Sequence, residues 1–330
     1  MAKTRPQAGR RGQVTVTALL ALAAGVGVLA WLFARAGLAP IETALAMIGV
    51  AGLLIVAAAH LPVIAVLGLA WRNSARMTPR PSAMHFVWAR ALRDAGSEVL
   101  PLSQFGGLAV GARALSLFDV GGRKAVIWTL LDLLVELATK LPYVLFGFGL
   151  LLLLRDGDLA GGAMLAAASA ATAFLVGTNS LDPASVVPSG RGPKLFRQVG
   201  VALRRWAPRP AQRRNAMALH LIGWFAGAAE TWLIFRLLGN GVALGPALVI
   251  DSLVGAIRMF GFFVPGAVGV QEGAYVLLCG IFAISPASAL AFSLIRRARD
   301  LLIAAAVFLP WPWREVQRLR NADPPSNLKP

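Results

Sequence analysis

Long apolar runs separated by short basic segments dominate this chain. Six of the runs approach or exceed the roughly 20 residues with which an α-helix crosses a hydrocarbon core of about 30 Å. The pattern predicts membrane-spanning helices over residues 14–33, 41–71, 124–154, 159–178, 216–238 and 287–309. The two longest contain Pro62 and Pro142, and a proline can kink a membrane helix where neighbours satisfy the freed carbonyl.

Two further apolar segments, 82–119 and 246–283, are interrupted by glycine and proline. Each consists of two short limbs around one proline, Pro101 or Pro265. A limb such as 82–97 would be only about 24 Å long as a helix, which is less than the hydrocarbon thickness. We predict two re-entrant helical hairpins. Two full crossings per segment would place the loops on the same sides, so that alternative stays open.

The composition agrees with a polytopic, all-α integral membrane protein. Hydrophobic residues make up 57% of the 330 residues and charged residues only 14%, against about 25% charged residues in soluble domains. We expect one transmembrane domain over 14–310, between a basic segment 1–13 and a tail 311–330. The run 14–33 is preceded by basic residues like a signal peptide, but it is longer than the usual ~7–15 apolar residues. An uncleaved helix is therefore favoured.

The net charge of +17 follows the topology and does not indicate nucleic-acid binding. Basic residues cluster in alternate connections, which is the positive-inside pattern. This places both termini and the basic loop 179–215 on the cytoplasmic side of a bacterial inner membrane. Within that loop, the apolar residues of 194–206 share one helical face. The segment predicts a surface helix on anionic lipid headgroups, with a plain basic loop as the alternative.

A candidate internal repeat relates the two interrupted segments. A shift of 164 residues places Pro101 on Pro265 and Glu136 on Asp300. With opposite entry sides this becomes an inverted repeat, an arrangement typical of transporters whose binding site lies between the repeats.

Several charged residues fall at membrane depth, where each costs roughly 2.5–3.5 kcal/mol on insertion scales. Glu136 and Lys140, and likewise Arg296 and Asp300, are four residues apart, a spacing that allows pairing along one helix. For these pairs, a structural and a binding role carry equal weight.

Arg258 and Glu272 flank a glycine-rich break, which favours binding, because irregular backbone at membrane depth is tolerated only inside protein or beside a cavity. Helix N-termini near Gly107 and Val270 are expected to favour an anion. The hypothesis is that a lipid headgroup is held between the hairpins. The candidate substrate-binding residues are Gly106, Gly107, Arg113, Asp132, Glu136, Arg258, Gly266, Gly269, Gln271, Glu272, Arg296 and Asp300.

No cofactor is expected. The chain has one cysteine and three scattered histidines, and it contains no zinc-protease motif, Walker A loop or nucleophile elbow.

The residues 262–275, which read FFVPGAVGVQEGAY, and 293–300 resemble the lysylphosphatidylglycerol synthase transmembrane-region family. They are most similar to its subfamily associated with hopanoid biosynthesis, and the segment 98–113 is similar to that subfamily's first hairpin. The resemblance covers about residues 80–310 and implies lipid translocation. It does not imply lysyl transfer, since no segment is expected to form the soluble transferase domain. Leu108 stands where the family pattern has glutamate, opposite Glu272 in the repeat, which argues against a two-carboxylate mechanism.

The predicted function is a lipid transporter or flippase for a polar or anionic-headgroup lipid, either a phospholipid or a hopanoid. One alternative is a membrane-embedded lipid-modifying enzyme with Glu272, Asp300 or Glu136 as general base. Another is a non-catalytic scaffold for lipid-biosynthesis enzymes.

Overall fold

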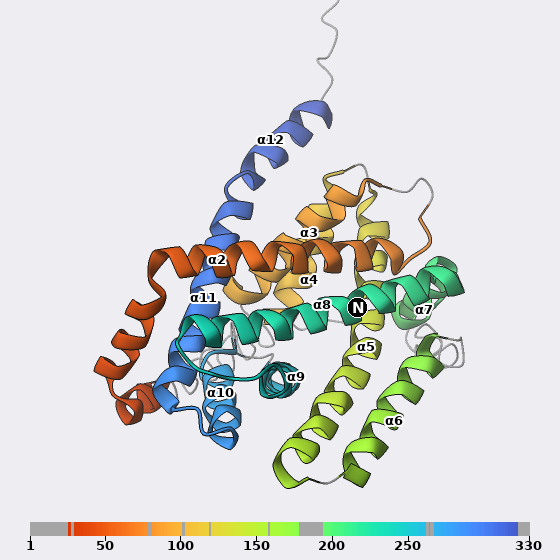
Figure 1. The fold of residues 1–330 in the computed structure, drawn as a ribbon. Helices are drawn as coiled ribbons and strands as arrows, with labels where there is room; N and C mark the ends of the chain where they lie inside the picture. The colour runs from red at the N-terminus through yellow and green to blue at the C-terminus, as the bar shows by residue number, and fades with distance from the viewer. Residues whose placement is uncertain are drawn as a thin grey trace, which may run out of the picture.

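Every element in the described part of the chain is a helix (Figure 1). The structure is a computed structural model that describes residues 26–27, 30–77, 81–100, 103–118, 120–157, 159–177, 194–261, 264 and 267–322. The helices are α2 (Leu38–Asn73), α3 (Ala83–Val99), α4 (Ser103–Ser116), α5 (Gly122–Asp156), α6 (Leu159–Gly177), α7 (Lys194–Trp206), α8 (Pro210–Leu237), α9 (Leu244–Phe260), α10 (Val270–Ile281), α11 (Pro286–Phe308) and α12 (Trp311–Ala322). The predicted all-α class is confirmed for these residues.

Within the residues that the structure describes, three helices are long and apolar enough to cross a membrane, namely α2, α5 and α8. They coincide with the predicted spans 41–71, 124–154 and 216–238. The helix α6 contributes a shorter apolar stretch, Leu159–Thr172. The helix α11 has 23 residues, but four charged side chains near its middle, Arg296, Arg297, Arg299 and Asp300, interrupt its apolar sequence. Most of the predicted span 14–33 lies outside the described residues. The described residues 30–36, at and just beyond the end of that span, are helical.

A sharp break divides α2 at Gly49, where φ is 57° and ψ is −171°. This positive φ is readily adopted by glycine because it has no Cβ. Pro62 lies inside the same helix without non-helical backbone angles, so the bend that Figure 1 shows in α2 comes from the glycine and not from the proline.

Both interrupted segments fold as pairs of short helices, α3 with α4 and α9 with α10. α3 and α9 each have 17 residues, about 25 Å of helix. α4 packs closely on α3 because Gly107 has no side chain: a Cβ there would lie 2.0 Å from the Ser97 hydroxyl oxygen and 2.5 Å from the Arg93 carbonyl oxygen. The helix–break–helix form is as expected, and re-entry into a membrane stays a prediction.

The contacts between helices fall into two matching sets. In an N-terminal unit of α2 to α5, α2 contacts α3 and α4 contacts α5; in a C-terminal unit of α8 to α11, α8 contacts α9 and α10 contacts α11. Across the units, α5 contacts α9, α11 contacts α3, and α2 contacts α8. Such reciprocal contacts are what a two-fold relation produces. They fit the predicted repeat, whose inverted placement in a membrane stays a prediction.

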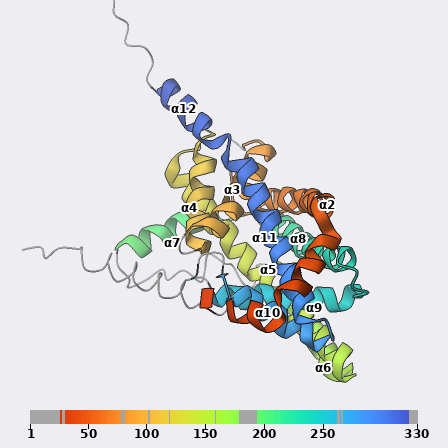
Figure 2. The ribbon, with the colours of Figure 1, turned by 90° about the vertical axis from the view of Figure 1, so that its left-hand side faces the viewer.

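Each unit contributes most of one apolar core. Trp71, Phe86 and Trp128 belong to the core of the N-terminal unit, and Phe235, Tyr275 and Phe292 to that of the C-terminal unit. The helices α6 and α12 project from opposite ends of this bundle (Figure 2). Charged side chains from both units lie where the two units meet.

Candidate functional site

A cavity of about 430 Å³ lies between the two units, within the roughly 300–1,000 Å³ typical of ligand sites. Residues of α2, α3, α4, α5, α8, α9, α10 and α11 line it. Its charged lining side chains are Arg90, Arg93, Asp94, Glu98, Glu136, Lys140, Asp251, Arg258, Arg296, Arg299 and Asp300. This density of charge inside an apolar bundle makes the cavity the candidate functional site.

On the N-terminal side, α3 and α5 are joined by guanidinium–carboxylate contacts. Arg90 donates to both oxygens of Glu136 at 3.1 and 3.2 Å. Arg93 donates to Glu136 and to Asp132, each at 2.7 Å. Asp132 is fully buried and also accepts from Ser74 at 2.9 Å and lies 3.2 Å from His220 Nε2.

The predicted pair of Glu136 with Lys140 along α5 is therefore wrong. Two arginines from α3 occupy the Glu136 carboxylate, and the planar guanidinium group makes paired hydrogen bonds that a single ammonium cannot match.

On the C-terminal side, Asp251 of α9 is the central acceptor. It accepts from Arg296 at 3.0 Å, from the Tyr143 hydroxyl at 2.9 Å and from Thr231 at 3.1 Å. Arg296 also donates to the Tyr275 hydroxyl at 2.8 Å.

The predicted pair of Arg296 with Asp300 is also wrong. Asp300 accepts from the neighbouring Arg299 at 2.6 and 3.0 Å. Arg299 also contacts Glu230, whose second oxygen lies 2.7 Å from His60 Nδ1. Helix α11 thus directs consecutive charged side chains to different neighbouring helices, which spacing along one helix does not reveal.

The two units carry related ion pairs with the charges exchanged. In the N-terminal unit the cation is Arg93 on α3 and the anion is Asp132 on α5. In the C-terminal unit the anion is Asp251 on α9 and the cation is Arg296 on α11. The shift of 164 residues places Asp132 on Arg296. Each pair joins the first short helix of its unit to the long helix that follows.

One ion pair connects the units directly. Arg258 in the last turn of α9 donates to Glu98 in the last turn of α3. Arg297 approaches the other Glu98 oxygen at 3.9 Å. Both α3 and α9 end just after this contact, so it fixes the ends of the two first limbs to each other.

Lys140 differs from the other lining cations. Its ammonium nitrogen lies 3.8 Å from the centre of the Trp224 ring and 5.2 Å from that of Tyr143. Within the described residues, no carboxylate lies within 4.0 Å of it and no acceptor binds it. The Trp224 indole nitrogen is buried and also has no hydrogen-bond partner there.

Four of the predicted site residues line the cavity, namely Glu136, Arg258, Arg296 and Asp300. Asp132 lies behind Arg93. Arg113 lies elsewhere: its side chain is 49% exposed and pairs with Glu315 of α12.

Gly106 and Gly107 lie within α4, which begins at Ser103, so Gly107 is not at the helix N-terminus that we expected there. Gly266 lies outside the described residues.

Gly269, Gln271 and Glu272 gather at the start of α10 and do not line the cavity. Glu272 is 1% exposed and accepts from the Gly269 N–H at 2.7 Å, from Ser293 at 2.9 Å and from Arg297 at 2.7 Å. Gln271 donates to Ser293 at 3.0 Å. The predicted anion site at this helix N-terminus is thus occupied by the chain's own carboxylate, as helix capping favours.

Sequence reasoning missed the charged face of α3. Arg90, Arg93, Asp94 and Glu98 recur at spacings of three and four residues, and such spacing places them on one face of a helix. That signal was available. The approach of Lys140 to Trp224 has no comparable signal, because it joins α5 and α8 through tertiary packing.

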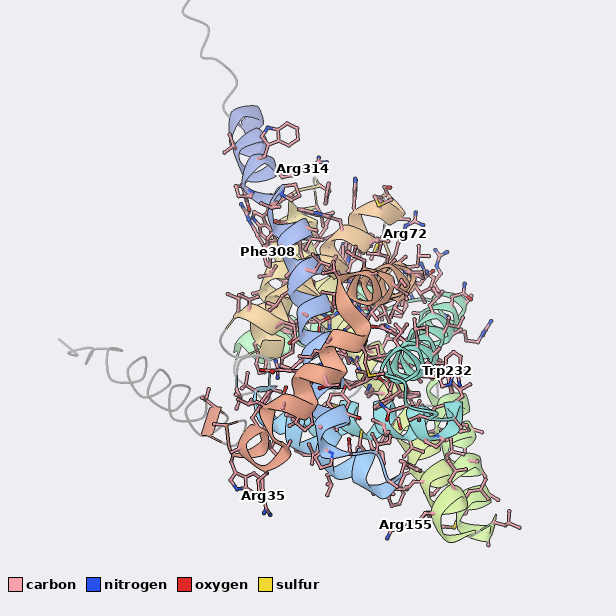
Figure 3. The ribbon with its side chains drawn as sticks, turned by 60° about the vertical axis from the view of Figure 1, so that its left-hand side comes forward. Arg35, Arg72, Arg155, Trp232, Phe308 and Arg314 are labelled. Atoms are coloured by element: carbon pink, nitrogen blue, oxygen red, sulfur yellow. The ribbon has the colours of Figure 1, made fainter. Side chains whose placement is uncertain are left out.

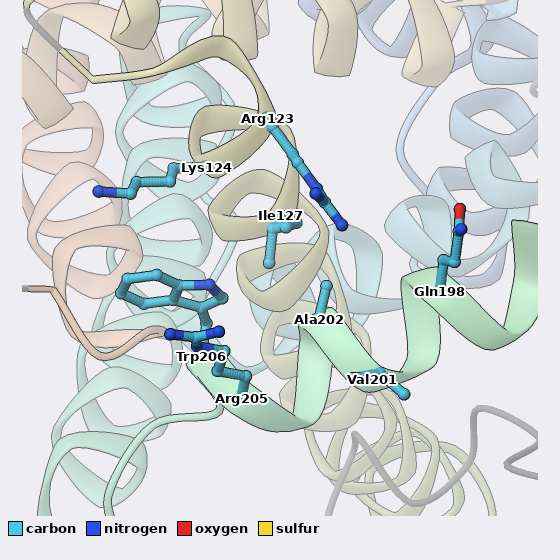
Figure 4. Close-up of a pocket in the computed structure, with 8 residues that line it drawn as sticks. All are labelled: Arg123, Lys124, Ile127, Gln198, Val201, Ala202, Arg205 and Trp206. Atoms are coloured by element: carbon cyan, nitrogen blue, oxygen red, sulfur yellow. The ribbon is translucent and has the colours of Figure 1, made fainter.

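A second hollow of about 520 Å³ lies between the start of α5 and α7 (Figure 4). Arg123, Lys124 and Arg205 lie around it, and Lys124 is 5.5 Å from the Trp206 ring centre. None of its lining residues is acidic; they are Arg123, Lys124, Ile127, Gln198, Val201, Ala202, Arg205 and Trp206. The chemistry of this basic pocket suits an anion.

The described residues include no group of three or more His, Cys, Asp and Glu side chains that could hold a metal ion. Cys279, the single cysteine of the chain, is buried in the core of the C-terminal unit.

Comparison with known families gives one match. A family model described as the lysylphosphatidylglycerol synthase TM region matches residues 18–307. No curated protein and no solved structure matches the chain. The match confirms the resemblance at the level of the family, and the hopanoid-associated subfamily stays a prediction.

Proposed function

Because the chain belongs to the lysylphosphatidylglycerol synthase transmembrane-region family, a lipid-related family of membrane proteins, we propose that it is a lipid transporter or flippase. Its substrate would be a lipid with a polar or anionic headgroup, bound in the charged cavity between the two units. A phospholipid and a hopanoid with a polar side chain both satisfy this description; the hopanoid rests on the sequence resemblance.

One observation carries this proposal: the same cavity has a charged interior and an apolar rim. Phe105, Leu137 and Met259 line it, and they are 58%, 40% and 44% exposed. They come from α4, α5 and α9, so the rim joins both units. A headgroup could occupy the interior while its apolar tail passes this rim into the surrounding bilayer.

The distribution of basic residues supports the proposed orientation. Figure 3 shows Arg72 and Arg314 toward one end of the molecule and Arg35 and Arg155 toward the other. We propose that the end with Arg72 and Arg314 faces the cytoplasm of a bacterial inner membrane, with both chain termini on that side. The pairs α3–α4 and α9–α10 would then enter from opposite sides, as re-entrant hairpins of an inverted repeat.

The basic pocket beside α7 fits this orientation. α7 lies within the loop 179–215, which is predicted to be cytoplasmic, and the cytoplasmic leaflet carries anionic lipids. We assign the pocket to the headgroup of an anionic lipid in that leaflet, with Arg123, Lys124 and Arg205 as its cationic contacts.

An enzyme would require an accessible general base, nucleophile or metal. The three carboxylates considered for that role each contact a guanidinium group: Glu136 contacts Arg93, Glu272 contacts Arg297, and Asp300 contacts Arg299. This engagement favours transport over catalysis. A scaffold for lipid-biosynthesis enzymes has no evident use for a charged cavity with a rim open to lipid.

The test is lipid movement in vesicles that contain the purified protein and a fluorescent phospholipid whose outer-leaflet signal is quenched chemically. Leu137→Trp fills the rim and is expected to slow movement, whereas Leu141→Trp alters an exposed leucine of α5 outside the cavity lining. Equal rates for both variants would contradict a route past this rim. A new lipid species formed in the vesicles would instead identify an enzyme. Lipid synthesis that depends on this protein only when partner enzymes are also present would identify a scaffold.

A further inference from the structure

We infer that Lys140 is the anchoring cation for the substrate and that the group it binds is the phosphate of a phospholipid headgroup. The inference rests on the proposed transport function and names its substrate class. It is carried by the pairing of charges around the cavity and by the surroundings of the Lys140 ammonium group.

The arginines that line the cavity are each satisfied by a carboxylate. Arg90 and Arg93 contact Glu136, Arg258 contacts Glu98, Arg296 contacts Asp251, and Arg299 contacts Asp300. Asp132 and Glu230, which lie behind the lining, are bound to Arg93 and Arg299. Within the described part of the cavity wall, Lys140 is the remaining cation that has no carboxylate within 4.0 Å.

The described residues give the Lys140 ammonium group aromatic contacts but no hydrogen-bond acceptor. The Trp224 ring centre at 3.8 Å and the Tyr143 ring centre at 5.2 Å stabilise the cation through their π faces, an interaction that strengthens when the cation is desolvated. An ammonium group has three N–H donors and no acceptor. The neighbouring Trp224 N–H, which is buried and has no partner among the residues that the structure describes, is likewise only a donor.

Glycine keeps space open at this position. A Cβ on Gly255 of α9 would lie 2.7 Å from the Lys140 ammonium nitrogen, so a side chain there would displace the ammonium from the cavity wall. Lys140 reaches this place from α5, opposite α9, and faces the cavity together with Trp224 and Gly255.

A ligand group that suits this position is negatively charged and offers hydrogen-bond acceptors to the Lys140 ammonium group and the Trp224 N–H. A phosphodiester meets both conditions, and lysine binds phosphate as a point charge. Inorganic phosphate shares this chemistry. The apolar rim of Phe105, Leu137 and Met259 favours the lipid, because a free anion would gain nothing from it.

The experiment compares wild type, Lys140→Met and Lys140→Arg in vesicles of phosphatidylcholine that contain one of two fluorescent probes. One probe is phosphatidylglycerol and the other is an uncharged diacylglycerol of the same chain length. We expect Lys140→Met to slow the movement of phosphatidylglycerol by about tenfold or more, as the loss of one charge-assisted hydrogen bond implies. Lys140→Arg should retain most of the rate, and the diacylglycerol probe should not distinguish the variants.

Two controls separate the possible outcomes. Arg155→Met removes a cation from the far end of α5, outside the cavity lining, and thermal unfolding in detergent shows whether each variant is folded; if Lys140→Met is not, Lys140→Gln replaces it. Equal phosphatidylglycerol rates in wild type and folded Lys140→Met would overturn the inference but leave transport intact. A wild-type protein that does not move phosphatidylglycerol would contradict the proposed transport of phospholipids, and this inference with it.

Competition distinguishes the two sources of phosphate. Short-chain dihexanoyl-phosphatidylglycerol should inhibit wild-type movement at far lower concentration than inorganic phosphate. Equal inhibition by both would overturn the assignment to a lipid headgroup and identify a site for a free anion.

Discussion

Glu98 of α3 and Arg258 of α9 form an ion pair that joins the last turns of the two first limbs, one from each unit. It is partly shielded, with side chains 14% and 23% exposed. We expect Glu98→Gln and Arg258→Gln to destabilise the protein non-additively, since either change removes the same contact. A double-mutant cycle by unfolding in detergent should give a coupling of about 0.5–3 kcal/mol. Additive effects would show that the pair does not hold the units together.

The buried pair of Arg93 with Asp132 should matter far more for stability than an exposed pair. Asp132→Ala leaves Arg93 without one partner and removes the contacts with Ser74 and His220. Removing one member of a buried pair costs about 3–5 kcal/mol. The matched control is Glu315→Ala, which breaks the surface pair with Arg113 and should cost about 0–1 kcal/mol. Similar losses of stability in both variants would contradict this account.

Gly107 should tolerate no side chain. Gly107→Ala places a Cβ 2.0 Å from the Ser97 hydroxyl oxygen and 2.5 Å from the Arg93 carbonyl oxygen, so α4 must move away from α3. We expect a loss of about 1–3 kcal/mol from overpacking, measured as a lower unfolding temperature. Gly273→Ala in α10 is the control, because no atom of the described residues lies within 4 Å of a Cβ there. That change should be neutral or stabilising, by up to about 1 kcal/mol from helix propensity.

The basic pocket beside α7 should bind anionic lipid in a salt-dependent manner. Neutralising Arg123, Lys124 and Arg205 to glutamine removes three cationic lining groups, each worth about 1 kcal/mol near an anionic surface. The amount of phosphatidylglycerol retained by the purified protein should fall, and high salt should lower it in wild type. Neutralising Arg35 and Arg155, at the opposite end (Figure 3), should leave it unchanged; an equal fall there would indicate unspecific charge attraction.

The helices and the interrupted segments were predictable because both depend on local properties of the sequence. Apolar length identified α2, α5 and α8, and the prolines 101 and 265 lie between the short helices of each pair. The position of the bend in α2 was less predictable, since the positive φ of Gly49 has no distinct sequence signal among many glycines.

The partners within the candidate site were not predictable from spacing. Glu136 and Lys140 have the spacing of a helical pair, yet Arg90 and Arg93 of another helix bind Glu136, and Trp224 contacts Lys140. Inside a bundle, the nearest opposite charge is decided by how helices pack. The sequence therefore predicted that charged residues lie within the apolar segments. Which of them form ion pairs depends on how the helices pack, and local spacing does not show this.

Accessibility of the two breaks will decide whether the short helices re-enter the membrane or cross it. The wild-type chain has one cysteine, Cys279, which is buried and should remain unlabelled in the native protein. Leu100→Cys and Phe262→Cys each add one cysteine at a break. If the pairs are re-entrant hairpins that enter from opposite sides, a membrane-impermeant thiol reagent outside intact spheroplasts should not label Leu100→Cys, and inside-out vesicles should not label Phe262→Cys. Full crossings require labelling of Leu100→Cys from outside and of Phe262→Cys from inside, and that result would replace the hairpins with four additional membrane spans.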